Sequence, residues 1–275
     1  MNDIASYVER YRTFDEPVPY QGIEIYPIVT KDYYKFTSCI DVLKIEKNKI
    51  PNIQIIQMSY LAFLLNLMIE SDEFRRCFIG ICELCFHIEF NTKYENGKFE
   101  KGQILYHNLG DKELYYINGY DIRIMQEGNS ATLYIHDKPI TSVEFDEIID
   151  IIFYQNFPNY DNTEMSEDFK KLMEEYYRLK NKDVTPPTIE QQLIAIMGQN
   201  GMSKSQLKEE TFYTVQSMIE SIISNVDYVI QHIYRSQAVT DKKLPDIEHW
   251  VIKSNKDRYA DMFTDVEEYT QNFEI

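Results

Sequence analysis

The sequence predicts an α+β fold that is mainly helical, with a small antiparallel β-sheet inserted in the middle. Apolar residues recur at helical spacing before residue 86 and after residue 141. Residues 86–140 instead hold short aromatic and β-branched runs separated by turn signals. The predicted organisation is an N-terminal strand with helices over 1–85, a β insertion over 86–141, and a helical region over 142–275 with a linker near 181–188.

The N-terminal part predicts one short strand followed by helices. Residues 22–27 alternate between apolar and polar side chains before a proline, which indicates a strand that stops pairing there. Thr30 is a suitable N-cap for a helix over 31–46. A second helix is expected over 54–70, and the apolar stretch 74–86 fits either a helix or a strand.

The middle of the chain predicts an antiparallel meander. Asn-Gly pairs are the strongest short hairpin signal, and one of them is Asn118-Gly119. Strands at roughly ten-residue spacing suggest a small antiparallel sheet. The expected strands are Phe86–Lys93, Lys98–His107, Glu113–Ile117, Asp121–Gln126 and Thr132–His136.

After residue 141 the pattern is helical. Ser142 and Thr188 are suitable N-caps, and Gly201 is suited to the left-handed residue that ends a helix. Pro186-Pro187 marks the clearest linker, since proline lacks a backbone donor and disrupts helices. Helices are expected over 142–154, 166–179, 188–199, a short stretch from 203, and 211–238, with a short one in the acidic tail 257–275.

Charge and hydropathy limit the function classes. The 28 basic and 45 acidic residues give a formal net charge of −17. Such a surface repels phosphate backbones and anionic lipid, so neither a nucleic-acid nor a membrane partner is expected. The most apolar stretch, 53–69, is shorter than the roughly 20 residues of a membrane span, so a core helix is expected there. Without a secretion signal, the four cysteines are expected to be reduced.

A cysteine cluster is the most metal-like motif. Cys82 and Cys85 have the CxxC spacing with which two thiolates reach one zinc, and Cys77 and His87 would have to complete the site. A metal-binding protein built on these four residues is one alternative function. The neighbouring residues are apolar and there is no second CxxC, so inert core thiols are favoured over metal or redox chemistry.

The only tryptophan, Trp250, follows His249 and Glu248. An aromatic anchor with a polar rim is typical of a partner contact, so these three residues are candidate partner-binding residues. Packing of Trp250 in a core is the favoured alternative.

Residues 199–207 resemble the turn of a helix-turn-helix, with a glycine and a serine cap between two helices. A DNA-reading helix would present basic residues, whereas here Lys204 and Lys208 are followed by Glu209 and Glu210. A plain helical corner is therefore the favoured interpretation.

Nucleotide-binding, hydrolase-nucleophile and calcium-loop motifs are missing from the sequence, as are HExxH and HxH pairs. We therefore expect a protein that is not an enzyme and needs no cofactor.

Several stretches together resemble a known group of proteins. The strand ending at Tyr26-Pro27 and the helix entered through Lys31-Asp32-Tyr33 contribute most. The full set is residues 14–27, 29–36, 157–161, 178–182, 246–253 and 256–259. In these stretches the chain resembles structural and tail-module proteins of tailed bacteriophages of Gram-positive hosts, above all tail assembly chaperones.

The resemblance implies a non-enzymatic phage morphogenesis protein, a tail assembly chaperone that binds the tape measure protein during assembly. Its partners would be other phage structural proteins such as the tape measure or tail tube protein. It would act in the host cell cytoplasm. The alternative is a permanent subunit of the virion, in the tail, neck or baseplate. Neither the oligomeric state nor any catalytic residue follows from the resemblance.

Overall fold

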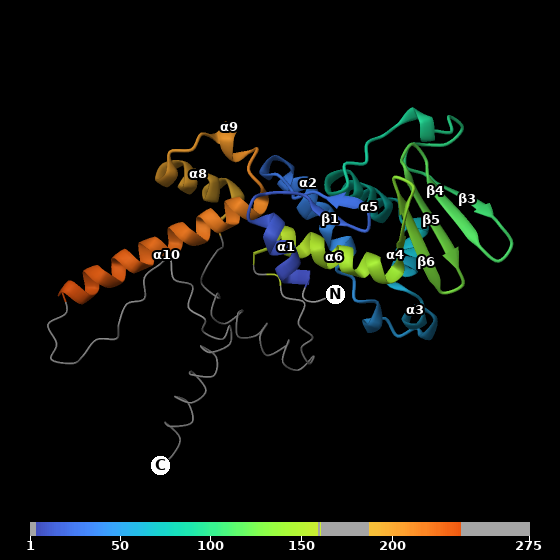
Figure 1. The fold of residues 1–275 in the computed structure, drawn as a ribbon, viewed down its shortest axis with the longest axis horizontal. Helices are drawn as coiled ribbons and strands as arrows, with labels where there is room; N and C mark the ends of the chain where they lie inside the picture. Colours follow the sequence, from blue (N-terminus) through green and yellow to red (C-terminus); the bar gives the residue numbers. More distant parts are fainter. Residues whose placement is uncertain (1–3, 159, 161–186, 238–275) are drawn as a thin grey trace, which may run out of the picture. The chain divides into compact units, whose positions relative to one another are not determined.

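A computed structural model describes residues 4–158, 160 and 187–237 (Figure 1). The chain divides into two compact units, residues 1–217 and 218–275. Helices combine with a two-stranded and a five-stranded antiparallel sheet, which confirms the predicted α+β class. The predicted helix over 166–179 and most of the predicted linker lie outside the described residues.

The chain begins with helix α1, Ile4–Arg12, and a hairpin of β1, Val18–Tyr20, and β2, Ile23–Ile25. The predicted strand is therefore present, but its partner β1 was not foreseen. Gln21 and Gly22 both have positive φ angles, which lets two residues reverse the chain.

The predicted helix over 31–46 is not continuous. It consists of the 3₁₀ turn η1, Thr30–Asp32, helix α2, Tyr33–Cys39, and the 3₁₀ turn η2, Ile40–Leu43. A further 3₁₀ turn, η3, covers Lys47–Lys49. Thr30 does not act as the predicted N-cap, because its hydroxyl donates to the carbonyl of Glu210, 2.9 Å away.

The predicted helix over 54–70 is broken into α3, Ile53–Gln57, and α4, Tyr60–Glu70. Ser59 causes the break: its side chain caps α4, and its backbone N–H donates to the carbonyl of Asn129, 2.7 Å away in a turn of the sheet. The apolar stretch 74–86, which fitted either a helix or a strand, belongs to a helix, α5, Asp72–Cys85.

The five-stranded sheet is a meander in which each strand pairs with the next along the chain. The predicted strand Phe86–Lys93 is wrong, because this segment is irregular and ends in the 3₁₀ turn η4, Thr92–Tyr94. The final strand was not predicted; it contains Pro139 and lies at the sheet edge, where proline is tolerated. The strands are β3 Ile104–Asn108, β4 Glu113–Ile117, β5 Ile122–Glu127, β6 Ser130–Ile135 and β7 Lys138–Thr141.

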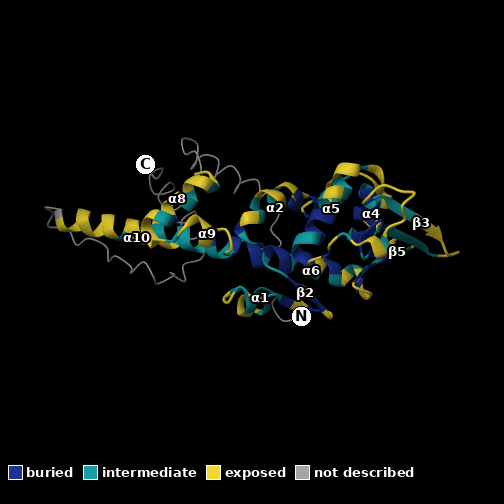
Figure 2. Cartoon of the chain, turned by 90° about the horizontal axis from the view of Figure 1, so that it is seen from above, coloured by how far each residue is buried: buried dark blue, intermediate teal, exposed yellow. Residues whose placement is uncertain are grey.

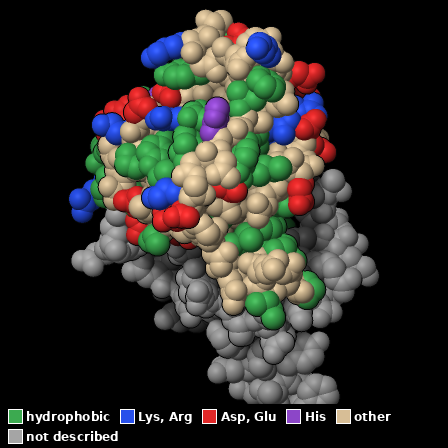
Figure 3. Space-filling view, turned by 90° about the vertical axis from the view of Figure 1, so that its right-hand side faces the viewer, with side chains coloured by type: hydrophobic (Ala, Val, Ile, Leu, Met, Phe, Trp, Pro, Cys, Tyr) green, Lys and Arg blue, Asp and Glu red, His purple; other side chains and the backbone are tan. Residues whose placement is uncertain are grey.

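The core lies between the sheet and the helices. Alternate residues of β5 and β6 are buried, and α4 and α6 both contact β6. Figure 2 shows buried residues in dark blue around α4, α5 and α6. Helix α6, Ser142–Asn156, starts with a capping box in which Thr141, not the predicted Ser142, is the N-cap. Viewed from the sheet end, apolar side chains are interspersed with charged ones (Figure 3).

The last described segment contains α8, Ile189–Asn200, α9, Lys204–Leu207, and α10, Phe212–Gln237. Thr188 and Ser203 each form a capping box, and Gly201 ends α8 in the left-handed conformation with φ of 70°. These caps and helices confirm the local predictions.

Candidate functional site

A candidate site forms where the 208–212 segment joins two distant parts of the chain. The Glu210 carbonyl accepts from the Thr30 backbone N–H at 2.8 Å, and the Phe212 N–H donates to the Ile28 carbonyl at 2.7 Å. Val29 and Thr211 form the antiparallel bridge between these bonds. This short ladder places α8 and α9 beside α2.

Buried apolar side chains fix this arrangement. Ile196 of α8, Leu207 of α9 and Val215 of α10 are fully buried, and Phe212 is nearly so. The Phe212 ring also lies 5.0 Å from the ring of Tyr33 in α2, measured between centroids. Because Ile196 is buried and α8 contacts α9, α8 is held by packing, whereas the backbone ladder fixes the segment that follows α9.

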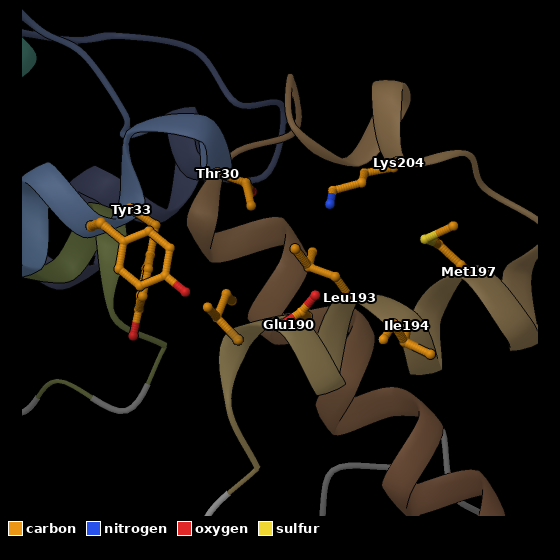
Figure 4. A pocket seen from close by; sticks show the side chains of 9 residues that line it. Thr30, Tyr33, Glu190, Leu193, Ile194, Met197 and Lys204 are labelled. Carbon is orange, nitrogen blue, oxygen red and sulfur yellow. The ribbon is translucent and has the colours of Figure 1, made fainter.

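A pocket of about 310 Å³ opens between α2 and α8 (Figure 4). Tyr33 stands on one side, Leu193, Ile194 and Met197 on the other, and Lys204 reaches in from α9. The complete lining is Thr30, Tyr33, Tyr34, Ile189, Glu190, Leu193, Ile194, Met197 and Lys204.

Two apolar side chains of the pocket lining are strongly exposed, so the apolar surface reaches the outside of the molecule. Tyr34 is 71% exposed and Ile194 is 60% exposed. Met197 can adapt to differently shaped apolar groups, and the tyrosine rings offer a large apolar area. The surface is therefore broader than a cavity enclosing a small molecule.

One acidic and one basic side chain border this surface. No ion pair joins Glu190 or Lys204 to another described residue. The pocket lining contains no histidine or cysteine. The arrangement can receive an apolar side chain and offer one negative and one positive group to the polar atoms around it.

The apolar periodicity of α8 predicts part of this site. Ile189, Leu193, Ile196 and Met197 recur at helical spacing, which predicts that they share one face. The structure divides them: Ile196 is buried, and the other three line the pocket. Ile194 and the α2 tyrosines were missed. Their role depends on the contact between α2 and α8, for which the sequence has no local signal.

The predicted partner-binding residues Trp250, His249 and Glu248 lie outside the described residues. The structure therefore neither brings them to the pocket nor separates them from it.

The cysteine motif lies on α5. Cys82 and Cys85 are buried, and burial raises the pKa of both thiols well above its usual value. Burial, together with neighbouring Cys39, raises the pKa of Cys77 to about 11. His87 stacks on Tyr26, with ring centroids 3.6 Å apart. Within residues 4–158, 160 and 187–237, no three His, Cys, Asp or Glu side chains gather as a metal-binding group.

A second cavity, of about 560 Å³, lies along α5 and is lined mainly by charged residues. Two of its three carboxylates have partners within the protein: Glu83 accepts from Lys35 at 2.6 Å and from the Tyr120 hydroxyl at 2.9 Å, and Asp72 pairs with Arg75. These groups stabilise the contact between α5 and its neighbours, so this cavity is a weaker candidate than the apolar pocket.

The segment that resembled a helix-turn-helix contributes to the pocket. Helix α9 has only four residues, and its Lys204 lines the pocket. Glu209 pairs with Lys31 at 3.0 Å, which attaches the following turn to η1. The corner therefore supports the packing of α8 on α2.

Comparison of the chain with protein families, with curated proteins and with solved structures gave no match. Among the described residues, none of the helices has the length and apolar character needed to cross a bilayer.

Proposed function

We propose that this chain is a non-enzymatic assembly protein that holds an amphipathic helix of a partner protein against the apolar pocket between α2 and α8. The observation that supports it is the pocket itself, continued outward by Tyr34 and Ile194. An amphipathic helix binds such a groove by inserting one or two apolar side chains at helical spacing.

The charges beside the pocket favour a helix with both charge signs. Glu190 can meet a lysine or arginine of the partner, and Lys204 can meet an acidic residue. Burying one leucine-sized side chain contributes about 1.5–3 kcal/mol. Association loses translational and rotational freedom, so one or two such side chains support transient binding. Transient binding suits a protein that releases its partner when assembly ends.

The resemblance to tail assembly chaperones specifies the partner within this proposal. The bound helix would belong to the tape measure protein, and the complex would form in the host cell cytoplasm during phage assembly. The chain would keep the tape measure soluble and leave before the particle is complete.

The test is co-expression with the tape measure protein. Ile194→Glu places a charge beside the pocket at an exposed position, so the variant should fold normally and lose co-purification at least about tenfold. Ala195→Glu is the matched control, because it adds the same charge at the next exposed position of α8, outside the pocket lining. Equal losses in both variants, or none in either, would contradict the proposed site.

Purified phage particles provide a second test. A chaperone should be missing from finished particles, and a fixed copy number in each would favour the virion-subunit alternative. Trp250→Ala tests the separate sequence prediction: a partner contact requires weaker co-purification at an unchanged melting temperature, whereas a large loss of thermal stability would assign Trp250 to a core.

A further inference from the structure

Helix α10 bears a second apolar surface, separate from the pocket. Ile219, Ile222, Val226, Val229 and Ile233 follow one another at spacings of three, four, three and four residues. This alternation is the heptad repeat, with positions named a to g, in which residues at a and d face neighbouring helices. We call these five residues the α10 seam; Ile219, Val226 and Ile233 occupy a, and the other two occupy d.

The seam becomes exposed along the helix. Phe212 and Val215 continue the same repeat toward the start of α10 and are buried. Val226, Val229 and Ile233 are 45%, 48% and 50% exposed. Figure 2 shows the far part of α10 coloured as exposed. Ile223 and Ile230, at the e positions, are also exposed and widen the stripe. A contiguous apolar stripe of this kind usually marks an interaction surface.

The charge pattern indicates what covers it. Partner choice between heptad helices is usually set by charged residues at e and g. Here the e positions are Ile223 and Ile230, and the g positions are Asn225 and His232. The charged residues Glu220, Asp227 and Arg235 occupy b and c, away from the seam. A second copy of this helix therefore meets no like charge in the contact, although the whole chain carries −17.

We propose that α10 is a self-association helix, and that copies of this chain join by packing their α10 seams together. β-Branched residues at both a and d, with apolar residues at e, favour a bundle of three or four helices over a two-stranded coil. Symmetric packing of identical surfaces closes such a bundle without leaving the stripe exposed. The partner pocket lies on other residues, so self-association does not depend on the proposed function.

The test compares the mass of the full chain and of two variants in solution. The seam variant combines Val226→Glu with Ile233→Glu. The control combines Ser224→Glu with Gln231→Glu, which adds the same charges at two f positions on the opposite side of the same helix. All four residues are exposed, so circular dichroism and melting of the N-terminal core should be the same in both variants.

Sedimentation at roughly 100 µM chain should give the wild type and the control several times the 32.8 kDa mass of one chain. The seam variant should sediment as a monomer. A monomeric wild type, including one whose α10 amides are protected from exchange by other parts of its own chain, would overturn the proposal. So would an oligomer that both variants retain.

Discussion

Asn118 should contribute more to stability than its place in a predicted hairpin turn suggests. Only 1% of the residue is exposed. Its side-chain oxygen accepts from the Asn96 backbone N–H at 2.7 Å, and its amide donates to the carbonyls of Phe99 and Glu100, each 3.0 Å away. The side chain thus bonds the 96–103 loop at Asn96, Phe99 and Glu100. Asn118→Ala removes them all.

The expected loss follows from these contacts. A buried hydrogen bond contributes about 1 kcal/mol net, and a donor left without a partner adds about 1–3 kcal/mol. The three short bonds, with the loop still partly reachable by water, give a loss of about 3–4 kcal/mol in the free energy of unfolding; the fourth, to the Asn96 carbonyl, is long at 3.4 Å and adds little. Since each 1 kcal/mol shifts the melting temperature by about 2–4 °C in a domain of this size, the melting temperature should fall by roughly 6–16 °C.

Urea unfolding followed by circular dichroism measures the change, and amide exchange locates it. Exchange should accelerate first in residues 96–103, because their partner is gone. Asn129→Ala is the control: Asn129 lies exposed in the β5–β6 turn, and the change should stay within about 0.5 kcal/mol. A loss below about 1 kcal/mol in Asn118→Ala, or an equal loss in the control, would refute the reasoning.

Three further predictions concern other parts of the chain. Ile196→Ala should lower the free energy of unfolding by about 2–5 kcal/mol, because Ile196 is fully buried. Ile194→Ala, at an exposed position, should change it by less than about 0.5 kcal/mol. Similar losses for the two variants in denaturant titrations would contradict the assigned packing of α8. Asp15→Ala should lower the free energy of unfolding by about 2–3 kcal/mol, because the Asp15 carboxylate accepts from the hydroxyls of Thr211 and Thr214. An unchanged melting curve would show that these hydrogen bonds are not needed for stability. The thiols of Cys82 and Cys85 should resist iodoacetamide at pH 8 until the protein unfolds, because their raised pKa keeps them protonated. Metal analysis should find no stoichiometric zinc. Fast labelling of the folded protein, or one zinc per chain that is lost in Cys82→Ser, would disprove this prediction.

The sequence alone determined the features that depend on near neighbours in the chain. Thr188 and Ser203 were identified as caps because each accepts from a backbone N–H three residues on, within one helical turn. Gly201 was identified because a left-handed helix end favours glycine. Most of the meander was also predicted, because turn signals between short apolar runs mark where one strand ends and the next begins.

Contacts between distant residues decided the rest. Ser59 breaks a helix that periodicity predicts as continuous, because its N–H bonds to a turn 70 residues later. The Thr30 hydroxyl donates to the Glu210 carbonyl instead of capping a helix. The backbone ladder between residues 28–30 and 210–212 brings α8 to α2 and creates the pocket. Apolar spacing likewise predicted α10, but only the three-dimensional packing distinguishes the buried Val215 from the exposed Val226 on the same face. Periodicity shows which side chains share a face, whereas burial depends on what the rest of the chain places against it.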